Sequence, residues 1–205
     1  MIYDIGNIGN KVYDCVDLGL PSKTLWSTMN VGASKPSDFG LYFQWGDTVG
    51  YTKNQIGKDK QFTWADYKWN PSGDGETFTK YAIKGITLEL KDDAANVYMR
   101  GDWHIPTPEQ IRELLDNTIS TWVTQDGVEG IKFTSKSGKS LFIPAAGYAL
   151  GGKVNNSGEY GYVWSSMLDP FYVRYVKYLY FSLNYNNLGN GSYRCNGYPV
   201  RGVIG

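Results

Sequence analysis

The feature that most constrains the fold is an alternation of residue types near the C-terminus. Residues 178–183 alternate between apolar Leu179, Phe181 and Leu183 and the set Tyr178, Tyr180 and Ser182. Successive side chains of a β-strand point to opposite faces of a sheet, so the pattern predicts a strand with one buried face. The other face should be aromatic and exposed to solvent.

Two polar segments flank this strand, residues 168–175 and residues 184–193, and both are predicted to be irregular. Nine of the seventeen tyrosines lie between Tyr160 and Tyr198, and the second segment is rich in Asn, Gly and Tyr. These residue types are typical of antibody-like binding surfaces. They are also common in turn-rich β domains, so a purely structural role stays open at this point.

Length and charge exclude several classes of protein. At 205 residues with a formal net charge of zero, the chain fits a single domain over residues 1–205. No basic cluster favours a nucleic-acid partner, and no apolar run approaches the roughly 18 residues that a membrane-spanning helix needs. The opening residues lack the regions of a signal peptide, so we expect either that the protein is not secreted by that route or that the sequence is trimmed.

The residues that commonly carry catalysis or metal binding are few. Cys15 and Cys195 lie near opposite ends of the chain, and we expect both to be free thiols. No CxxC or Cys/His cluster supports a zinc site, and no cofactor is predicted. The only histidine, His104, has no nucleophile motif beside it, so a structural role is favoured over catalysis.

Two helices are predicted in the middle of the chain. Residues 92–99 have helical composition and an acidic first turn. Thr107 is expected to cap a second helix, with Pro108 at its first position and Gln110 completing a capping box. This helix should end near Asn117.

The remaining elements are short strands, which we place at residues 12–16, 24–26, 41–45, 121–124, 131–134 and 140–144. The turn pairs between the last three are Asp126-Gly127, Glu129-Gly130 and Ser137-Gly138. Residues 51–81 are expected to form a long surface insertion, and residues 147–158 a loop. Strands followed by two helices and then more strands indicate an α+β domain with antiparallel sheets.

Several longer segments carry a resemblance to a known family. They are VDLGLPSKTLWSTMNVGA, FGLYFQWGDT, TLELKDDAANVYMRGDWHIPTPEQIRELLDN, LFIPAAGY, and GYVWSS with the later YLYF and YRCNGYPVRGV. On these segments the chain resembles the major paralogous (FISUMP-type) domains abundant in gut bacteria and their phages. Its closing pattern also looks like the variable proteins of diversity-generating retroelements. The resemblance implies a C-type-lectin-like fold, with two helices packed on antiparallel sheets and long loops.

The resemblance also implies a ligand-binding function on the outer face of the C-terminal sheet. Tyr178 and Tyr180 would be rigid anchors of this surface. The predicted ligand-binding residues are Leu168, Asp169, Phe171, Tyr172, Arg174, Tyr178, Tyr180, Asn184, Tyr185, Asn187, Tyr193 and Asn196. The expected partner is a protein or a glycan on a cell surface, and the expected location is extracellular, on a bacterial surface or a phage virion.

Diversification of this surface is a further expectation from the resemblance. Adenine-directed mutagenesis of AAC-like codons yields only residues whose codons end in C, and residues 168–175 and 184–195 all belong to that set. Met167 and Lys177 fall outside it and would be fixed scaffold.

Two other functions stay open on the sequence. The domain could be a structural component of a fimbria, a surface lipoprotein or a phage fibre. It could also be an enzyme, since related folds include the enzyme that makes formylglycine. Neither a cysteine pair of that kind nor the Glu-Pro-Asn or Gln-Pro-Asp motif of calcium-dependent lectins occurs in the chain.

Overall fold

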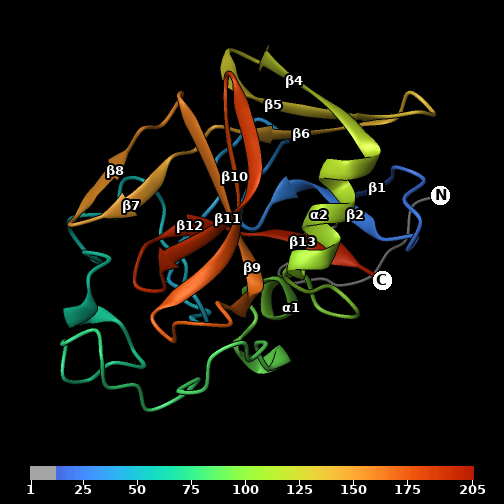
Figure 1. Ribbon diagram of the computed structural model, residues 1–205. Helices are drawn as coiled ribbons and strands as arrows, with labels where there is room; N and C mark the ends of the chain where they lie inside the picture. The colour runs from blue at the N-terminus through green and yellow to red at the C-terminus, as the bar shows by residue number, and fades with distance from the viewer. Residues whose placement is uncertain (1–12) are drawn as a thin grey trace.

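The structure, a computed structural model, describes residues 13–205. Within them, antiparallel strands form five small sheets, and two α-helices lie among these sheets (Figure 1). The α+β organisation with antiparallel sheets agrees with the expectation from the sequence. Val12 of the first predicted strand and the opening segment without signal-peptide regions lie outside the described residues.

One sheet joins the two ends of the described chain. It consists of β1 (Cys15–Asp17), β2 (Leu25–Asn30) and β13 (Arg201–Ile204), with β2 in the centre. A two-stranded sheet pairs β3 (Tyr42–Phe43) with β12 (Tyr198–Pro199). The N-terminal strands are thus held by the C-terminal segment. Cys15 and Cys195 are both free, as predicted.

A second three-stranded sheet follows the helices in sequence. Its strands are β4 (Thr118–Gln125), β5 (Val128–Ser135) and β6 (Ser140–Pro144). The turn at Asp126-Gly127 is confirmed, since both residues have positive φ, as type I′ hairpins require. The turn predicted at Glu129-Gly130 is wrong, because both residues lie inside β5. A Cβ at Gly130 would stand 2.4 Å from the carbonyl oxygen of Ile143, so close strand packing, rather than a turn, explains this glycine.

The two helices are close to their predicted positions. α2 (Pro108–Asn117) begins at the Thr107 cap, and Gln110 completes the capping box as predicted. α1 is shorter than expected, Ala94–Met99, and follows the 3₁₀ turn η2 (Leu90–Asp92). Asp93 caps α1 by accepting a hydrogen bond from the backbone N–H of Asn96 at 3.0 Å. Within residues 13–205, neither helix has the length and apolar character that crossing a bilayer requires.

Two segments expected to be irregular differ from each other. Residues 51–81 form a long excursion with one 3₁₀ turn, η1 (Trp64–Asp66), and Tyr67 buries its ring against the body of the protein. The loop predicted at residues 147–158 instead contains a hairpin of β7 (Tyr148–Leu150) and β8 (Lys153–Asn155). The sequence predicted a loop here because glycines occupy the turn between these two short strands.

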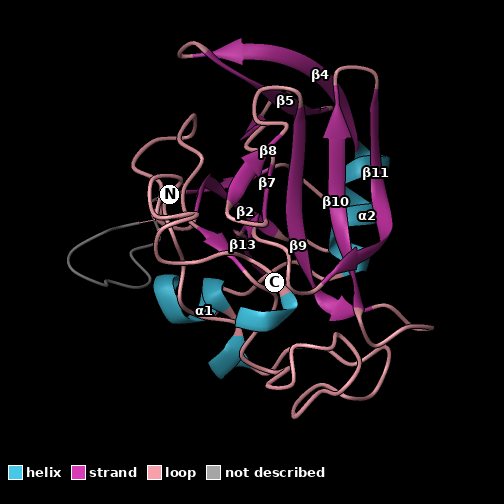
Figure 2. Cartoon of the chain, turned by 90° about the vertical axis from the view of Figure 1, so that its left-hand side faces the viewer, coloured by secondary structure: helices cyan, strands magenta, loops and turns pink. Residues whose placement is uncertain are grey.

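The third three-stranded sheet carries the alternating segment. Its order is β11 (Tyr185–Tyr193), β10 (Tyr175–Ser182) and β9 (Tyr160–Leu168), and the strands stand side by side in Figure 2. The prediction that residues 184–193 are irregular is wrong, because Asn and Gly residues there pair along the full edge of β10. Backbone pairing has overridden their low strand propensity.

The inner face of this sheet packs on α2 and the β4–β5–β6 sheet. Leu179 and Phe181 are fully buried there with Ile111, Leu114 and Phe133, which confirms the predicted face. The predicted burial of Leu183 is wrong, because this residue lies in the hairpin turn after β10 with 63% of its surface exposed. The strand ends one residue too early to bury it.

A paired substitution tests this assignment. Phe181→Ala should lower the free energy of unfolding by about 3–5 kcal/mol, because it leaves a cavity in the core. Leu183→Ala removes an apolar side chain from the turn and should change it by less than about 0.5 kcal/mol. Urea unfolding of both variants measures the difference. Equal losses would mean that the turn is packed in solution.

Candidate ligand-binding face

Five tyrosines lie on the outer face of the β9–β10–β11 sheet, and we call this set the tyrosine face. They are Tyr160 and Tyr162 of β9, Tyr178 and Tyr180 of β10, and Tyr185 of β11. Tyr180 pairs directly with Tyr162, and Ser182 pairs with both Tyr160 and Tyr185. Residues directly opposite each other in an antiparallel sheet share a face, so the register brings the rings together.

The rings form a continuous series of contacts. Tyr160 stacks on Tyr180 with 5.9 Å between ring centroids, and Tyr162 stacks on Tyr178 at 6.0 Å. Tyr162 also lies 5.4 Å from Tyr180, which in turn lies 5.9 Å from Tyr185. Such aromatic pairs stabilise one another beyond their buried area. The tyrosine face is therefore an ordered surface rather than a set of independent side chains.

Tyr178 is held partly by the core beneath the tyrosine face. Its ring lies over Gly189 of β11, where a Cβ would stand 2.5 Å from the ring. It also packs against the buried residues Trp164 and Tyr198, so it belongs partly to the core. Burial raises the pKa of both Tyr178 and Tyr180, and neighbouring phenols raise it further. Their hydroxyl groups therefore remain protonated at neutral pH.

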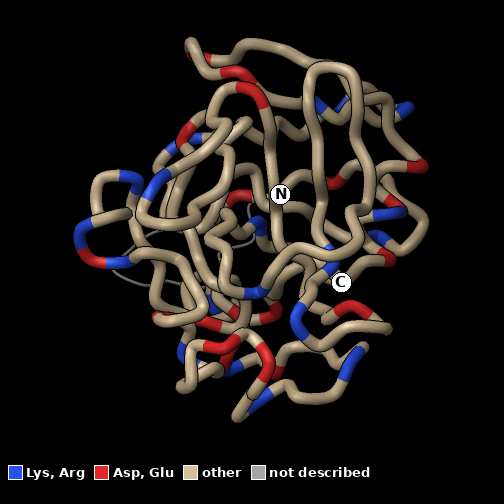
Figure 3. Tube along the Cα trace, turned by 60° about the vertical axis from the view of Figure 1, so that its left-hand side comes forward, with Lys and Arg blue, Asp and Glu red and all other residues tan. Residues whose placement is uncertain are grey.

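The same strands contain very little charge. Lys177 is the only charged residue in β9, β10 and β11, while acidic and basic segments are scattered over the rest of the chain (Figure 3). A face of phenol, amide and hydroxyl groups has no preference for a strongly charged partner.

A β-bulge interrupts the sheet at Lys177. Between the pairs Val176–Ser192 and Tyr178–Gly189, β10 contributes one residue, Lys177, whereas β11 contributes Asn190 and Gly191. Gly191 has φ +93°, which favours glycine. Bulges re-aim side chains and are frequent beside binding sites.

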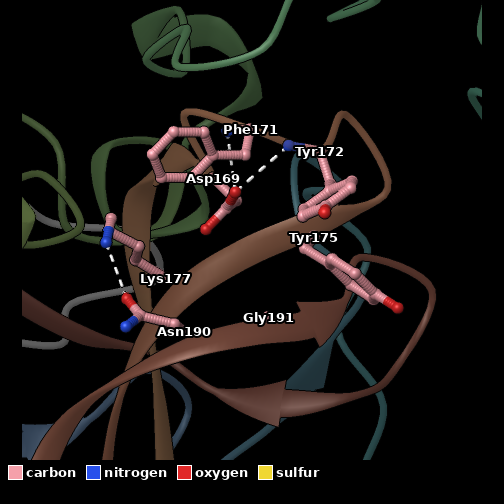
Figure 4. A pocket seen from close by; sticks show the side chains of 7 residues that line it. All are labelled: Asp169, Phe171, Tyr172, Tyr175, Lys177, Asn190 and Gly191. Atoms are coloured by element: carbon pink, nitrogen blue, oxygen red, sulfur yellow. Dashed lines mark hydrogen bonds between the residues drawn. The ribbon is translucent and has the colours of Figure 1, made fainter.

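A pocket of about 440 Å³ opens at this bulge (Figure 4). We call it the bulge pocket; it lies between the β10–β11 bulge and the rim loop, residues 169–174, which joins β9 to β10. Its side chains are Asp169, Phe171, Tyr172, Tyr175, Lys177 and Asn190. The aromatic groups come mainly from the rim loop, and the lysine and amide come from the bulge.

Hydrogen bonds to the Asp169 side chain hold the conformation of the rim loop. Its carboxylate Oδ1 accepts hydrogen bonds from the backbone N–H groups of Phe171 at 2.8 Å and Tyr172 at 3.1 Å. These bonds turn the chain so that Phe171 and Tyr172 project outward, with 72% and 61% of their surfaces exposed. Exposed aromatic rings on an ordered loop are typical of recognition surfaces.

The rim loop is also tied to the insertion at residues 51–81. Arg174 forms an ion pair with Glu76 of that insertion. A chain of rings runs from Tyr172 to Tyr175 at 5.7 Å, on to Tyr193 at 5.0 Å, and then to Trp64 of the insertion at 5.6 Å. The insertion thus supports the rim loop.

The guanidinium of Arg194 lies fully buried beneath these contacts. Its Nε donates to the hydroxyl of Tyr67 at 2.7 Å, and its two terminal nitrogens donate to the carbonyl oxygens of Tyr81, Val173 and Lys80 at 2.9–3.1 Å. The group also lies 4.3 Å from the ring centroid of Phe78. One side chain therefore joins the rim loop to the insertion.

Ten of the twelve predicted ligand-binding residues fall into three groups in the structure. On or beside the tyrosine face lie Tyr178, Tyr180, Tyr185 and Asn187, the last donating to the Tyr185 hydroxyl at 2.9 Å. Around the rim loop lie Asp169, Phe171, Tyr172, Arg174 and Tyr193. Asn184 is exposed in the turn between β10 and β11, apart from the rim loop.

The predicted ligand-binding role is wrong for two residues, because both are buried. Leu168 is fully buried in the core at the end of β9, where it cannot contact a ligand. Asn196 is buried and donates to the Ser192 hydroxyl at 3.2 Å, so it serves the packing beneath the tyrosine face. Both lie in segments with the right composition, but composition does not reveal burial.

Five further site residues were not predicted. Tyr160 and Tyr162 have period-two spacing with Trp164 in the sequence, a signal that places them on one strand face. Tyr175, Lys177 and Asn190 line one pocket at the bulge, for which Gly191 is the available signal in a segment that was predicted to be irregular.

His104 lies apart from both surfaces. Its ring nitrogens lie 2.9 Å from the carbonyl oxygen of Ile105 and 3.2 Å from that of Gly205, and its backbone pairs with Val203. These contacts join the segment before α2 to β13. Residues 13–205 contain no group of three or more His, Cys, Asp and Glu side chains placed to hold a metal ion.

Arg194→Lys tests how the rim loop is supported. Lysine keeps the charge but lacks the planar fork, so several buried carbonyl oxygens lose their donors. We expect a loss of about 2–4 kcal/mol in the free energy of unfolding. Arg174→Lys is the matched control at a partly exposed ion pair, with an expected change below about 1 kcal/mol. Equal effects in chemical unfolding would show that Arg194 has no special structural role.

Comparison of the chain with protein-family models, with curated proteins and with solved structures found no match.

Proposed function

We propose that the chain is a ligand-binding domain that recognises a protein or a glycan on a cell surface through the tyrosine face and the rim loop. The observation that carries this proposal is the series of five tyrosines in ring contact on one outer sheet face. Tyrosine supplies a large contact area with few rotatable bonds and a hydroxyl that can donate or accept. Order before binding also lowers the entropic cost of association.

The surroundings of the tyrosine face support binding rather than packing alone. Phe171 and Tyr172 of the rim loop are mostly exposed although they are large and apolar, and Tyr185 and Asn187 are exposed on β11, toward the other end of the sheet. A rim of amide and hydroxyl groups around aromatic anchors is the usual anatomy of an interface. We assign no catalytic step to the domain, since the ring of His104 contacts backbone carbonyl groups.

The proposal includes a C-type-lectin-like fold and an extracellular location, on a bacterial surface or a phage virion. Support for the fold comes from two helices packed among antiparallel sheets, with a long irregular insertion at residues 51–81. Support for the location comes only from the resemblance of the sequence segments to surface and phage domains.

Diversification of the surface is the second part of the proposal. Its expected variable positions are the exposed ones, such as Phe171, Tyr172, Asn184 and Asn187. The fixed positions include Lys177, which stands at the bulge, and Met167. A surface of this kind could change its side chains without changing the fold, because the inner face of the sheet carries the packing.

Binding to intact cells tests the tyrosine face. The labelled protein is titrated onto a panel of gut bacteria and measured by flow cytometry. The double variant Tyr160→Ser/Tyr180→Ser should bind at least about tenfold more weakly. Tyrosines that become buried in an interface are frequent hot spots of binding energy. Ile119→Ser, at an exposed position on β4, is the matched control and should bind normally.

Thermal unfolding of the same variants separates binding from folding. The double variant loses ring contacts only between partly exposed side chains and should remain folded at the temperature of the binding assay, whereas Tyr178→Ala also loses packing on the core residues Trp164 and Tyr198. Undiminished cell binding by a folded double variant would refute the proposal. Self-association that the double variant abolishes would instead assign the tyrosine face to assembly.

Nucleotide sequencing around the gene tests diversification. We expect a near-identical downstream repeat that differs at adenines within the codons for residues 168–175 and 184–196, beside a reverse transcriptase gene. Absence of such a repeat would make the surface a fixed one with a single evolved partner.

A further inference from the structure

The bulge pocket combines flat apolar walls with a small number of polar groups. Its walls are the rings of Phe171, Tyr172 and Tyr175. A volume of about 440 Å³ lies within the range of small-molecule sites. Rings of this kind can stack against the apolar face of a planar or ring-shaped ligand.

The polar groups of the pocket have unused hydrogen-bonding capacity. Asp169 is nearly buried, and its Oδ1 accepts two backbone N–H groups, whereas no group of residues 13–205 donates to its Oδ2. Figure 4 shows Oδ2 facing the open space between the rim loop and the strands. The Lys177 ammonium donates to Asn190 Oδ1 at 2.7 Å, which leaves two of its three hydrogens and the Asn190 amide hydrogens for a ligand.

These groups place an acceptor and several donors around one space. The carboxylate and the ammonium carry opposite charges, and no ion pair within 4 Å joins them in the described chain. A cationic ligand would be repelled by Lys177, and an anionic one by Asp169. A purely apolar ligand would cover Oδ2 of Asp169 without a hydrogen bond, which is costly.

A neutral ligand with several hydroxyl groups satisfies all of these constraints. Each hydroxyl can donate to Asp169 Oδ2 and accept from Lys177 or Asn190 at the same time. The C–H face of a pyranose ring would then lie against an aromatic wall. A second hollow of about 670 Å³ shares Phe171, Tyr172 and Tyr175 with the bulge pocket and extends toward Glu76 and Arg174, so a neighbouring sugar has room.

We propose that the bulge pocket binds a neutral pyranose residue, so that the target of the domain is a glycan. This inference rests on the proposed binding function and narrows its partner to one class. Asp169 and Lys177 would orient the hydroxyl groups, and Phe171, Tyr172 and Tyr175 would stack on the ring. None of these contacts uses a metal ion, so binding should be the same in the presence of EDTA.

The test is an array of neutral and charged oligosaccharides, probed with the whole chain in EDTA, followed by calorimetric titration of the best neutral binder. We expect binding to neutral glycans that survives EDTA. Asp169→Asn keeps an oxygen for the turn but replaces the free acceptor by a donor, and it should weaken affinity at least about tenfold. Phe171→Ala removes an exposed wall without disturbing the core and should weaken affinity similarly.

Ile119→Ala on β4 is the control and should bind like the wild type, and thermal unfolding verifies that each variant is folded. Binding restricted to charged glycans would overturn the inference, as would neutral-glycan binding that folded Asp169→Asn and Phe171→Ala both retain. Loss of binding on chelation would overturn it as well.

The array result also separates this inference from the proposed function. If no neutral glycan binds, but cells are bound in a manner that depends on Tyr160 and Tyr180, the pyranose inference fails and the binding function stands. If a neutral glycan binds and only the pocket variants weaken it, the bulge pocket is the site and the role proposed for the tyrosine face fails.

Discussion

The buried guanidinium of Arg194 is the interaction on which the candidate site depends. It hydrogen-bonds to Tyr67, to the carbonyl oxygens of Lys80 and Tyr81, and to that of Val173 in the rim loop. Within the described residues no carboxylate forms an ion pair with it, so carbonyl dipoles and the faces of Trp45, Tyr67 and Phe78 surround the charge. Only the planar fork of arginine can reach several acceptors from one buried position.

This arrangement explains how a long irregular insertion can support an ordered surface. Irregular backbone needs partners for its carbonyl groups when it is buried. Arg194 supplies three of them, and its own backbone belongs to the segment that follows β11. The rim loop and the insertion are thereby fixed relative to the sheet, and the exposed rings of Phe171 and Tyr172 gain a defined position although neither belongs to the core.

Arg201 performs the corresponding task at the other end of the C-terminal segment. Its guanidinium is fully buried and donates to Asn30 Oδ1 and to the carbonyl oxygens of Ser27 and Phe142, which joins β13 to β2 and β6. The two arginines hold the C-terminal segment on both sides of β12. Buried side chains of the C-terminal segment therefore hold the sheet on which the tyrosine face lies.

Local patterns in the sequence determined the cap of α2 at Thr107 and the burial of Leu179 and Phe181, because capping and strand alternation depend on neighbouring residues alone. Only the tertiary structure decided that residues 184–193 are a strand, that Leu168 and Asn196 are buried, and that Lys177 contacts Asn190 and lines one pocket with Asp169. Pairing partners and strand register are contacts between distant segments, and the same Asn, Gly and Tyr residues are compatible with a loop or an edge strand. The sequence by itself thus predicted a tyrosine-rich surface, and packing decided which of its residues are exposed.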